Sequence, residues 1–358
     1  MSDEAFVTLV ASDNYVLGGL TLAYSLRETN TQRKLVCLVT HKVSQTIRDR
    51  LAAAFDEVVA VSELNSNDSV NLDLLCRPEL GITFTKLFIW KLTQYKKTVF
   101  LDADTLVLKN VDELFDREEF SAAPDVGWPD CFNSGVFVCV PNLDTFHELV
   151  ELSENTGSFD GGDQGLLNEY FCDWSTKDIH KHLPFVFNLN ANATYFYAPA
   201  YKRYGKDAKI VHFIGAAKPW MHARDANGVL HADNAEHLVE HLDLWWACHD
   251  RHVQDINLPQ SFYPEEYVPS ASAGRQQFST QWYGGVASHS SSHSTQPPAS
   301  GFAAIEAKLN EAMGGKREYK QASPTTGAQN SGGKVPAAGL SEELESKVVL
   351  KKKPEESA

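Results

Sequence analysis

The sequence predicts an α/β fold, and two observations carry this prediction. From about residue 5 to residue 262, short apolar runs alternate with segments whose apolar residues recur at helical spacing. The 358-residue chain is also 43% hydrophobic, so it has enough apolar side chains for a large buried core. We therefore expect one α/β domain at residues 1–262.

The first part of the chain alternates between the two patterns. Val16, Leu20 and Ala23 lie three or four positions apart, which predicts a helix. Uninterrupted apolar runs before and after it predict buried strands. In order, the elements expected here are a strand at 5–10, a helix at 16–26, a strand at 35–40, a helix at 44–55 and a strand at 58–61.

The later elements are predicted in the same way. A helix at 84–92 leads to an apolar run at 99–107, which is expected to be one buried strand. Another extended run at 136–140 ends at Pro141, because proline lacks the N–H that a strand ladder needs. Two further segments are a strand-like aromatic stretch at 194–197 and an amphipathic helix at 234–248.

Composition changes sharply after Pro264. Ser, Gly, Gln, His and Pro dominate residues 263–358, and such a segment cannot bury enough apolar surface to fold alone. We expect a largely disordered tail there. Within it, apolar residues at 301–314 fall on one helical face, which predicts a helix that docks on a partner or frays.

Net charge and the absence of certain segments exclude several classes of partner. A formal charge of −15 argues against nucleic acid or an acidic membrane, because binding either needs a basic face. No apolar stretch approaches the roughly 20 residues of a membrane helix, and the acidic N-terminus does not resemble a signal peptide. Six cysteines without CxxC spacing are expected to be reduced thiols. We therefore expect a cytoplasmic protein.

The run at 99–107 contains two carboxylates, Asp102 and Asp104, one residue apart. In extended backbone these side chains would point the same way and repel each other. A divalent cation removes that penalty, and hard oxygen ligands suit Mn²⁺ or Mg²⁺ better than Zn²⁺. Such a cation commonly holds a diphosphate, so we expect a nucleotide-sugar site. The alternative is that both carboxylates simply end a strand at the surface.

A second acidic cluster follows at Asp160-Gly161-Gly162-Asp163-Gln164. Its glycines allow a tight turn and a close approach to a ligand, while its carboxylates and amide suit sugar hydroxyls. A surface turn is the alternative.

No glycine-rich phosphate loop occurs, so a nucleotide would be held by other groups. Tyr15, just after the first strand, could stack on a base or pack beside the next helix.

His212 lies in an apolar run, and Lys218 follows six residues later. A buried histidine is often a satisfied core residue. With two aspartates in need of a third ligand, His212 would complete a metal site, and Lys218 would neutralise the departing phosphate.

The segment His237-Leu-Val-Glu-His241 matches an inverted zinc-protease pattern. We discount that interpretation, because the segment fits an amphipathic helix with a solvated polar face.

Taken together, these residues resemble glycosyltransferase family 8, and within it the self-glucosylating glycogenins. The resemblance covers about residues 4 to 262. The matching stretches are long and specific, and they lie at 77–81, 85–87, 100–108, 121–125, 127–137, 157–168 and 181–185.

The resemblance implies a GT-A type, Rossmann-like fold, Mn²⁺ (or Mg²⁺), UDP-glucose as donor and retention of configuration. It implies that Asp102, Asp104 and His212 hold the metal and that Tyr195 is the glucosylated acceptor. The catalytic residues would be Asp163, Lys218, Gln164 and Lys86. The residues implied to surround UDP-glucose are Leu9, Ala11, Ser12, Tyr15, Arg77, Lys86, Asp102, Ala103, Asp104, Asn133, Ser134, Asp160, Asp163, Gln164, His212, Gly215 and Lys218.

The sequence departs from the vertebrate-like pattern at Ala11-Ser12, where Thr-Asn is usual. This departure implies the loss of one or two uridine hydrogen bonds, at about 1 kcal/mol each.

Partners follow from the same resemblance. The tail would recruit glycogen synthase, although Gln281-Trp282-Tyr283-Gly284 matches the docking motif only in outline. A homodimer is expected, because one active site can hardly serve both a fixed tyrosine and a lengthening chain. Two alternatives stay open: another family 8 hexosyltransferase acting on a free acceptor, and a non-catalytic scaffold that recruits glycogen synthase.

Overall fold

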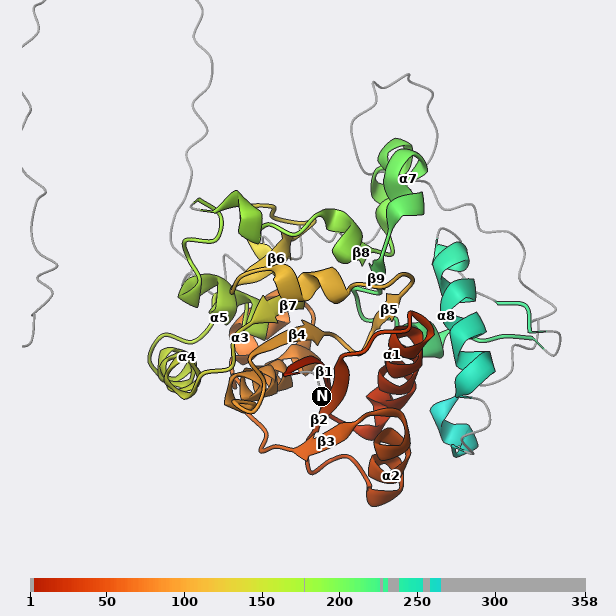
Figure 1. Cartoon of the computed structure of the whole chain (residues 1–358), viewed down its shortest axis with the longest axis horizontal. Coiled ribbons are helices and arrows are strands. Elements are labelled where there is room, and N and C mark those ends of the chain that lie inside the picture. Colours follow the sequence, from red (N-terminus) through yellow and green to blue (C-terminus); the bar gives the residue numbers. More distant parts are fainter. Residues whose placement is uncertain (1–2, 177, 226–227, 231–237, 254–257, 265–358) are drawn as a thin grey trace, which may run out of the picture. The chain divides into compact units, whose positions relative to one another are not determined.

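A six-stranded mixed sheet lies at the centre of the computed structural model (Figure 1), in the strand order β3-β2-β1-β4-β7-β6. The neighbours among β3, β2, β1 and β4 are parallel, whereas β7 is antiparallel to both β4 and β6. The strands are β1 (Glu4–Val10), β2 (Lys34–Val39), β3 (Glu57–Ala60), β4 (Lys97–Leu101), β6 (Ser121–Pro124) and β7 (Phe132–Cys139).

The structure describes residues 3–176, 178–225, 228–230, 238–253 and 258–264. All of these belong to one of the two compact units of the chain. The predicted tail at 263–358, with its helix at 301–314, lies outside the described residues except for its first two positions. The domain boundary at residue 262 therefore stays a prediction.

A second, smaller sheet has the strand order β5-β9-β8. It consists of β5 (Thr105–Val107), β9 (Ile210–His212) and β8 (Leu189–Asn190), and β9 is antiparallel to β5 and parallel to β8. Because β5 follows β4 after three residues, the chain passes directly from the large sheet to the small one.

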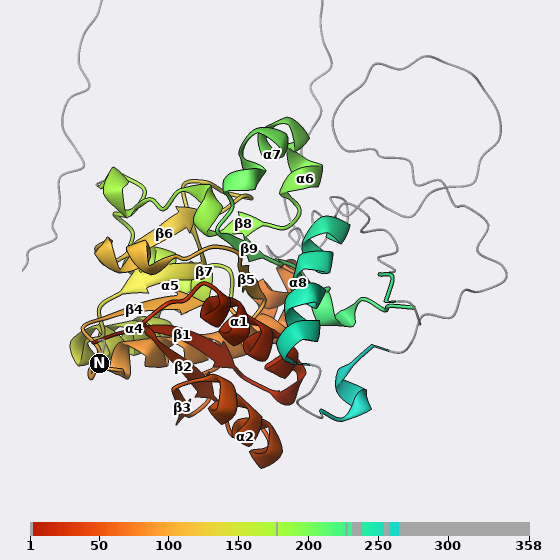
Figure 2. The ribbon, with the colours of Figure 1, turned by 45° about the vertical axis from the view of Figure 1, so that its right-hand side comes forward.

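Strand β1 shows how the sheet divides the core. Phe6 and Val10 pack in one hydrophobic cluster, and Val7 and Leu9 pack in another, as alternation along a strand requires. Figure 2 shows α1, α2 and α8 on the first side, and α4 and α5 lie on the other. The α-helices are α1 (Val16–Glu28), α2 (Gln45–Ala54), α3 (Ser69–Leu74), α4 (Leu143–Asn155), α5 (Asp163–Tyr170), α6 (Ala193–Phe196), α7 (Ala198–Tyr204) and α8 (Val239–His252).

Short 3₁₀ helices connect these elements, and η2 (Pro78–Lys91) is the longest. The predicted helix at 84–92 therefore exists, but it is longer and of the 3₁₀ type. Phe84, Leu87 and Trp90 are all buried at a spacing of three, which places them on one face of a helix with three residues per turn. The others described are η1 (Asp13–Tyr15), η3 (Asp112–Asp116), η4 (Ile179–Lys181), η5 (Phe185–Phe187), η6 (Gly205–Asp207), η7 (Pro219–Met221) and η10 (Gln260–Phe262).

Two sequence predictions about local structure are wrong. The run at 99–107 is not one strand, because a turn at 102–104 separates β4 from β5. The aromatic stretch at 194–197 is not a strand either, since α6 spans most of it. There the Asn190 side chain accepts a hydrogen bond from the Asn192 amide at 2.9 Å, a local turn that ends β8.

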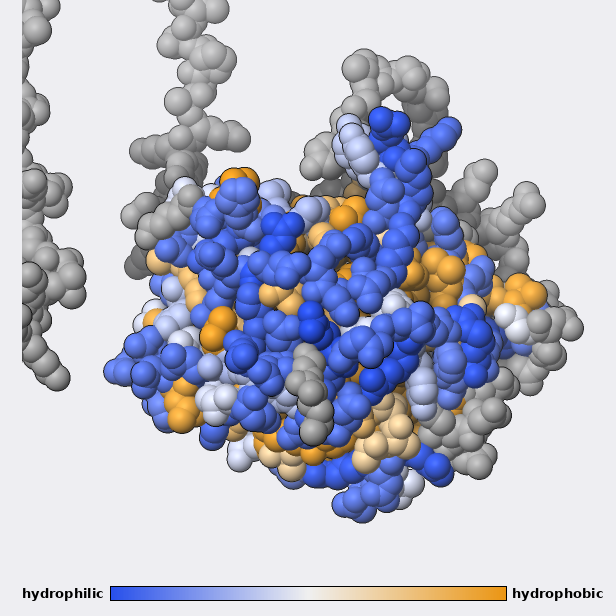
Figure 3. Space-filling model, viewed as in Figure 1, coloured by the Kyte–Doolittle hydropathy of each residue, from blue (hydrophilic) through white to orange (hydrophobic). Residues whose placement is uncertain are grey.

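The visible surface is mostly hydrophilic, and the cysteines are unpaired. Hydrophilic residues cover most of the face seen in Figure 3, where hydrophobic colour occurs in separate patches. All six cysteines are free thiols. In the part of the chain that the structure describes, no helix is both long and apolar enough to span a bilayer.

Candidate functional site

The turn between β4 and β5 brings Asp102 and Asp104 together. The amide of Thr105 donates to the carbonyl of Asp102 at 3.0 Å, and the Thr105 hydroxyl donates to the same oxygen at 2.7 Å. The amide of Asp102 is held by the carbonyl of Gly135 on β7 at 2.8 Å. The two carboxylates therefore converge because the chain turns between two sheets, and not because it is extended.

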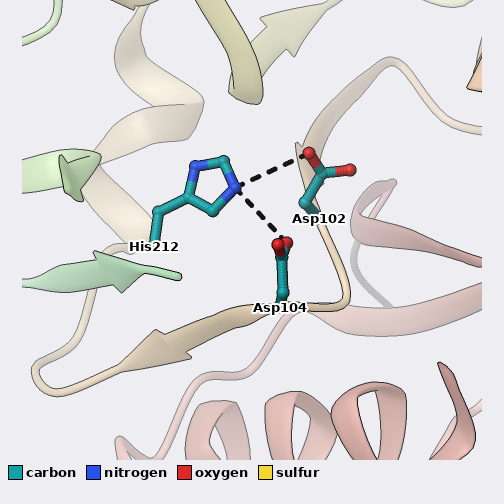
Figure 4. Close-up of side chains that lie close together, drawn as sticks. All are labelled: Asp102, Asp104 and His212. Carbon is teal, nitrogen blue, oxygen red and sulfur yellow. Dashed lines mark ion pairs between the residues drawn. The ribbon is translucent and has the colours of Figure 1, made fainter. Parts of the chain in front are cut away.

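His212 ends β9 and lies opposite Thr105 in the strand register. Its Nε2 is 3.3 Å from Asp104 Oδ1 and 3.8 Å from Asp102 Oδ2 (Figure 4). Its Nδ1 is 2.9 Å from Asn188 Oδ1, and the Asn188 amide group donates to Asn133 Oδ1 at 2.8 Å. With the proton on Nδ1, the lone pair of Nε2 faces the two carboxylates.

Gly135 leaves the space that the His212 ring occupies. A Cβ at this position would lie 2.1 Å from His212 Cε1 and 2.5 Å from Nδ1, so any larger residue would displace the ring. Sequence analysis missed both Gly135 and Asn188 as supports of His212. Gly135 stood within a matching stretch, but nothing in the sequence indicated what it packs against.

These three side chains fit a divalent cation. One ligand atom from each of Asp102, Asp104 and His212 lies within 4.8 Å of the others, and all three residues are largely buried. Two carboxylates and a neutral imidazole suit a cation such as Mn²⁺ or Mg²⁺.

Two buried lysines are paired with the carboxylates of this site. Lys86 Nζ lies 2.9 Å from both Asp102 Oδ1 and Asp163 Oδ2, and Lys218 pairs with Asp104. Burial opposes the charge of Asp104, but Lys218 and His212 outweigh it and hold the pKa of that carboxyl well below its usual range. Burial also opposes the charge of Lys86, yet Asp102 and Asp163 raise the pKa of its ammonium.

A cavity of about 800 Å³ opens beside these groups, a volume that suits a nucleotide-sized ligand. Every residue predicted to surround the donor lines it, among them Leu9, Tyr15, Asp163 and Gln164. Their individual roles stay predictions. The cavity wall also contains residues that sequence analysis did not single out, among them Asn14, Asn65, Thr83, Asp125 and Ala216.

Asp125 joins the polar groups at the end of the cavity near Gln164. Its Oδ2 accepts hydrogen bonds from Asn133 Nδ2 at 3.0 Å and from Gln164 Nε2 at 3.1 Å. Gln164 Oε1 in turn accepts from Asn133 Nδ2 at 3.0 Å and from the Ser134 amide at 3.2 Å. This closed network fixes an amide and a carboxylate beside the cavity, as recognition of sugar hydroxyls requires.

The loop before α5 has its own internal support. Asp160 Oδ1 accepts hydrogen bonds from the Ser158 hydroxyl at 2.8 Å, the Gly162 amide at 2.8 Å and the Gly165 amide at 3.0 Å. Gly161 has φ +76°, which favours glycine, and burial raises the pKa of Asp160. Asp160 therefore shapes the loop that presents Asp163 to Lys86.

Tyr15 stands at the start of α1, between the cavity and Trp220. The two rings meet edge to face with centroids 5.6 Å apart. Burial and then the nearby Asp104 raise the pKa of the Tyr15 phenol to about 12, so it stays protonated. On the next turn, a Cβ at Gly18 would lie 2.4 Å from the Ala103 carbonyl, so this glycine lets α1 approach the Asp102–Asp104 turn.

Tyr195 lies in α6, and its side chain is outside the described part of the structure. The backbone before Tyr195 is bonded to β9, the strand that ends at His212. Asn190 lies opposite His212 in the strand register, and the Ala191 amide donates to the His212 carbonyl at 3.0 Å. The proposed acceptor therefore follows shortly after a segment that adjoins the candidate metal site.

Several known proteins are similar to this chain in sequence. The sequence model of the family described as "Glycosyl transferase family 8" matches residues 6–119 and 116–223. Glycogenin-1 of Mus musculus is 54% identical over 250 residues, covering 69% of this chain and 75% of that protein. Glycogenin-1 of Homo sapiens is 54% identical over 251 residues, covering 69% and 71%.

One solved structure extends the comparison to the fold. The galactosyltransferase LgtC, in complex with donor and acceptor sugar analogs, has a TM-score of 0.51 at 18% identity, covering 72% of this chain and 98% of that one. A likeness at this identity concerns the fold alone. It confirms the predicted GT-A type architecture.

Proposed function

The chain belongs to glycosyltransferase family 8, where it groups with the glycogenins, and on that premise we propose that it glucosylates itself. Glucose would pass from UDP-glucose to the phenol of Tyr195, and further glucoses would extend an α-1,4-glucan with retention of configuration. The observation that carries the proposal is the convergence of Asp102, Asp104 and His212 beside a cavity lined by sugar-binding groups.

The three convergent side chains would hold the metal, for which we propose Mn²⁺ with Mg²⁺ as a weaker substitute. A bound divalent cation supplies charge neutralisation for the diphosphate as it leaves. Lys218 would add a second positive charge beside the leaving group, because it lines the cavity next to Asp104. Lys86 would hold Asp163 in place through their ion pair.

Transfer is proposed to occur on the front face of the sugar. The bond from glucose C1 to the phosphate oxygen breaks, the Tyr195 oxygen bonds to C1, and the phenol proton passes to the leaving phosphate oxygen. Asp163 and Gln164 would position the sugar during this exchange. Gln164 is suited to the task because hydrogen bonds to three groups, on Asp125, Asn133 and Ser134, fix its side-chain amide.

Two finer features belong to the same proposal. Transfer would take place partly between the subunits of a homodimer, since Tyr195 sits at a fixed place in the fold while the glucan grows. The tail at 263–358 would recruit glycogen synthase. A deletion of residues 280–315 that still co-purifies glycogen synthase at full yield would contradict the second point.

Intact-protein mass spectrometry tests the central claim. Incubation with UDP-glucose and Mn²⁺ should add a ladder of hexose increments, and Tyr195→Phe should abolish it. Tyr197→Phe is the matched control, because this neighbouring tyrosine is largely exposed and lies outside the donor cavity. A ladder that survives in Tyr195→Phe would move the acceptor elsewhere, and turnover of UDP-glucose only with a free acceptor would favour another family 8 transferase.

A further inference from the structure

A second cavity of about 250 Å³ lies beyond the donor site. None of its lining residues belongs to the donor cavity or to the groups assigned above. They come from the loop between β6 and β7, the loop before α5, and α5 with the segment after it. They are Asp130, Cys131, Phe159, Asn168, Glu169, Phe171, Cys172, Trp174 and Ser175.

The lining combines aromatic rings with groups that bind hydroxyls. Phe159, Phe171 and Trp174 supply the rings, and Asp130 and Glu169 supply carboxylates. The lining contains no cationic side chain, so its two carboxylates would repel a phosphate. The hydroxyl groups of a neutral polyhydroxy ligand could instead donate hydrogen bonds to these carboxylates. Apolar faces with a few placed polar groups are what a sugar site requires, since each ring presents apolar faces and a polar edge.

This second cavity is built on rigid parts. Trp174 is buried, its indole N–H donates to the Lys181 carbonyl at 3.2 Å, and its ring stacks on His182 with centroids 3.8 Å apart. Asn168 exchanges hydrogen bonds with the backbone of Phe132, with both contacts at 3.0 Å. A preformed cavity of this kind binds a ligand without first ordering its own walls.

The two cavities are lined by different residues of the same helix and loops. Asn168 lies one helical turn after Gln164 in α5 and donates to its carbonyl at 2.9 Å, so one helix lines both. Asp125 lines the donor cavity, and Cys131, at the other end of the same loop, lines the second; the Asp125 amide donates to the Cys131 carbonyl at 2.9 Å. Phe159 lines the second cavity immediately before Asp160, which lines the first.

Two exposed aromatic residues lie in the loops that connect the two cavities. Trp128 is 66% exposed and Phe159 is 56% exposed, which is unusual for side chains of this size. The backbone of Trp128 is held in place, because its amide donates to Asp125 Oδ1 at 3.3 Å and its carbonyl accepts from the Cys131 amide at 2.9 Å. An exposed indole on a loop whose two ends line the two cavities offers a stacking surface.

We propose that Trp128, Phe159 and the second cavity form a binding site for the α-glucan product, which holds the growing chain as it leaves the donor site. The inference rests on the proposed function, since it takes the glucan as the occupant. Holding the chain there raises the local concentration of its end near the donor. The site would act on elongation and not on transfer of the first glucose.

Chain length and saccharide affinity test the site together. Trp128→Ala and Glu169→Ala should each still accept the first glucose on Tyr195 but stop at shorter chains in the mass ladder. Their affinity for maltoheptaose should fall about tenfold, measured by isothermal titration. Leu143→Ala, which trims an exposed apolar residue at the start of α4, is the control and should change neither quantity. Unchanged ladders and affinities in both variants would overturn the inference.

Thiol protection provides a readout that needs no transfer. Cys172 is exposed and lines the second cavity, so saturating maltoheptaose should slow its alkylation by iodoacetamide about fivefold or more, whereas UDP should not. Cys76 is exposed outside this cavity and serves as the internal control. Equal alkylation of Cys172 with and without the saccharide would refute the site. A wild-type chain that shows protection but builds no ladder would instead refute the proposed self-glucosylation.

Discussion

Two buried histidines in this protein have opposite surroundings. His212 is 4% exposed and His241 is 2% exposed, so burial does not distinguish them. His212 faces two carboxylates, bonds to Asn188 and fits a space kept open by Gly135. Among the described residues, neither ring nitrogen of His241 has a hydrogen-bond partner, and its ring meets Tyr201 edge to face at 5.4 Å.

The difference shows that a buried histidine becomes a metal ligand through its partners. His212 has one nitrogen fixed by an amide and the other directed at anionic oxygens, which is the arrangement a cation needs. Burial lowers the pKa of His241, and only the charge of Glu240 opposes this effect, so His241 serves as an apolar side chain. The discounted zinc-protease pattern ended at this residue, and its first histidine, His237, lies outside the described part of the chain.

The largest expected effect follows from neutralising one carboxylate beside His212. Asp104→Asn should lower glucose transfer about 10³-fold, because the cation site loses a charged ligand and Lys218 loses its partner. Initial rates of hexose incorporation measure this loss. Glu240→Gln, which neutralises the carboxylate near His241, is the control and should retain full transfer. Comparable losses in both variants would remove the distinction between the two histidines.

A smaller effect should come from filling the space next to His212. Gly135→Ala would place a methyl group within the His212 ring, and a displaced ligand should cost about 10- to 100-fold in metal affinity. Calorimetric titration with Mn²⁺ measures the affinity. Gly162→Ala is the matched control, because no atom lies closer than 3.6 Å to a Cβ there. Unaltered Mn²⁺ affinity in Gly135→Ala would show that His212 is not a ligand.

The free energy of unfolding should depend on pH through the protonation of His241. Its folded pKa lies below the ordinary 6.5, so the unfolded chain binds more protons as the pH falls below that value. The free energy of unfolding should therefore decrease from about pH 6.5 downward, by at most about 1.4 kcal/mol per pH unit for this group.

Replacement of the ring tests that assignment. His241→Phe keeps an aromatic side chain but cannot take up a proton, so the variant should lose less stability between pH 7.5 and pH 5.5 than the wild type. Urea denaturation at the two pH values measures the difference. Burial lowers the pKa of His222 and His249 as well, so part of the slope should persist. An identical slope in His241→Phe would contradict the prediction.

The smallest expected effect concerns Ser12, which also lines the donor cavity. If hydrogen-bond partners determine binding here as they do around His212, then adding a polar group should strengthen the binding of UDP. Ser12→Asn should raise the affinity for UDP about fivefold through one added hydrogen bond, which is worth about 1 kcal/mol. Competition binding measures the change. Val70→Ala, on the exposed side of α3, should leave it unaltered. Weaker binding in Ser12→Asn would show that this end has no room for the amide.

Much of the fold was predictable because strands and helices leave a local signature. The predicted strand at 5–10 and helix at 16–26 match β1 and α1 to within a few residues, since the strand is an uninterrupted apolar run and the helix repeats apolar residues at helical spacing. The stretch at 194–197 was mispredicted because aromatic residues favour strands only where a neighbouring strand can pair with them.

By itself, the sequence determined the alternation of strands and helices and the acidic pair at Asp102 and Asp104, which follow from residue type and spacing along the chain. The residues expected around the donor were implied by the family resemblance, and all of them line the cavity. Only the tertiary structure decided that a turn between two sheets makes the carboxylates converge, and that Asn188 and Gly135 orient His212 toward them. The reason is physical: contacts between residues far apart in the chain depend on how the sheets pack, which no local pattern records.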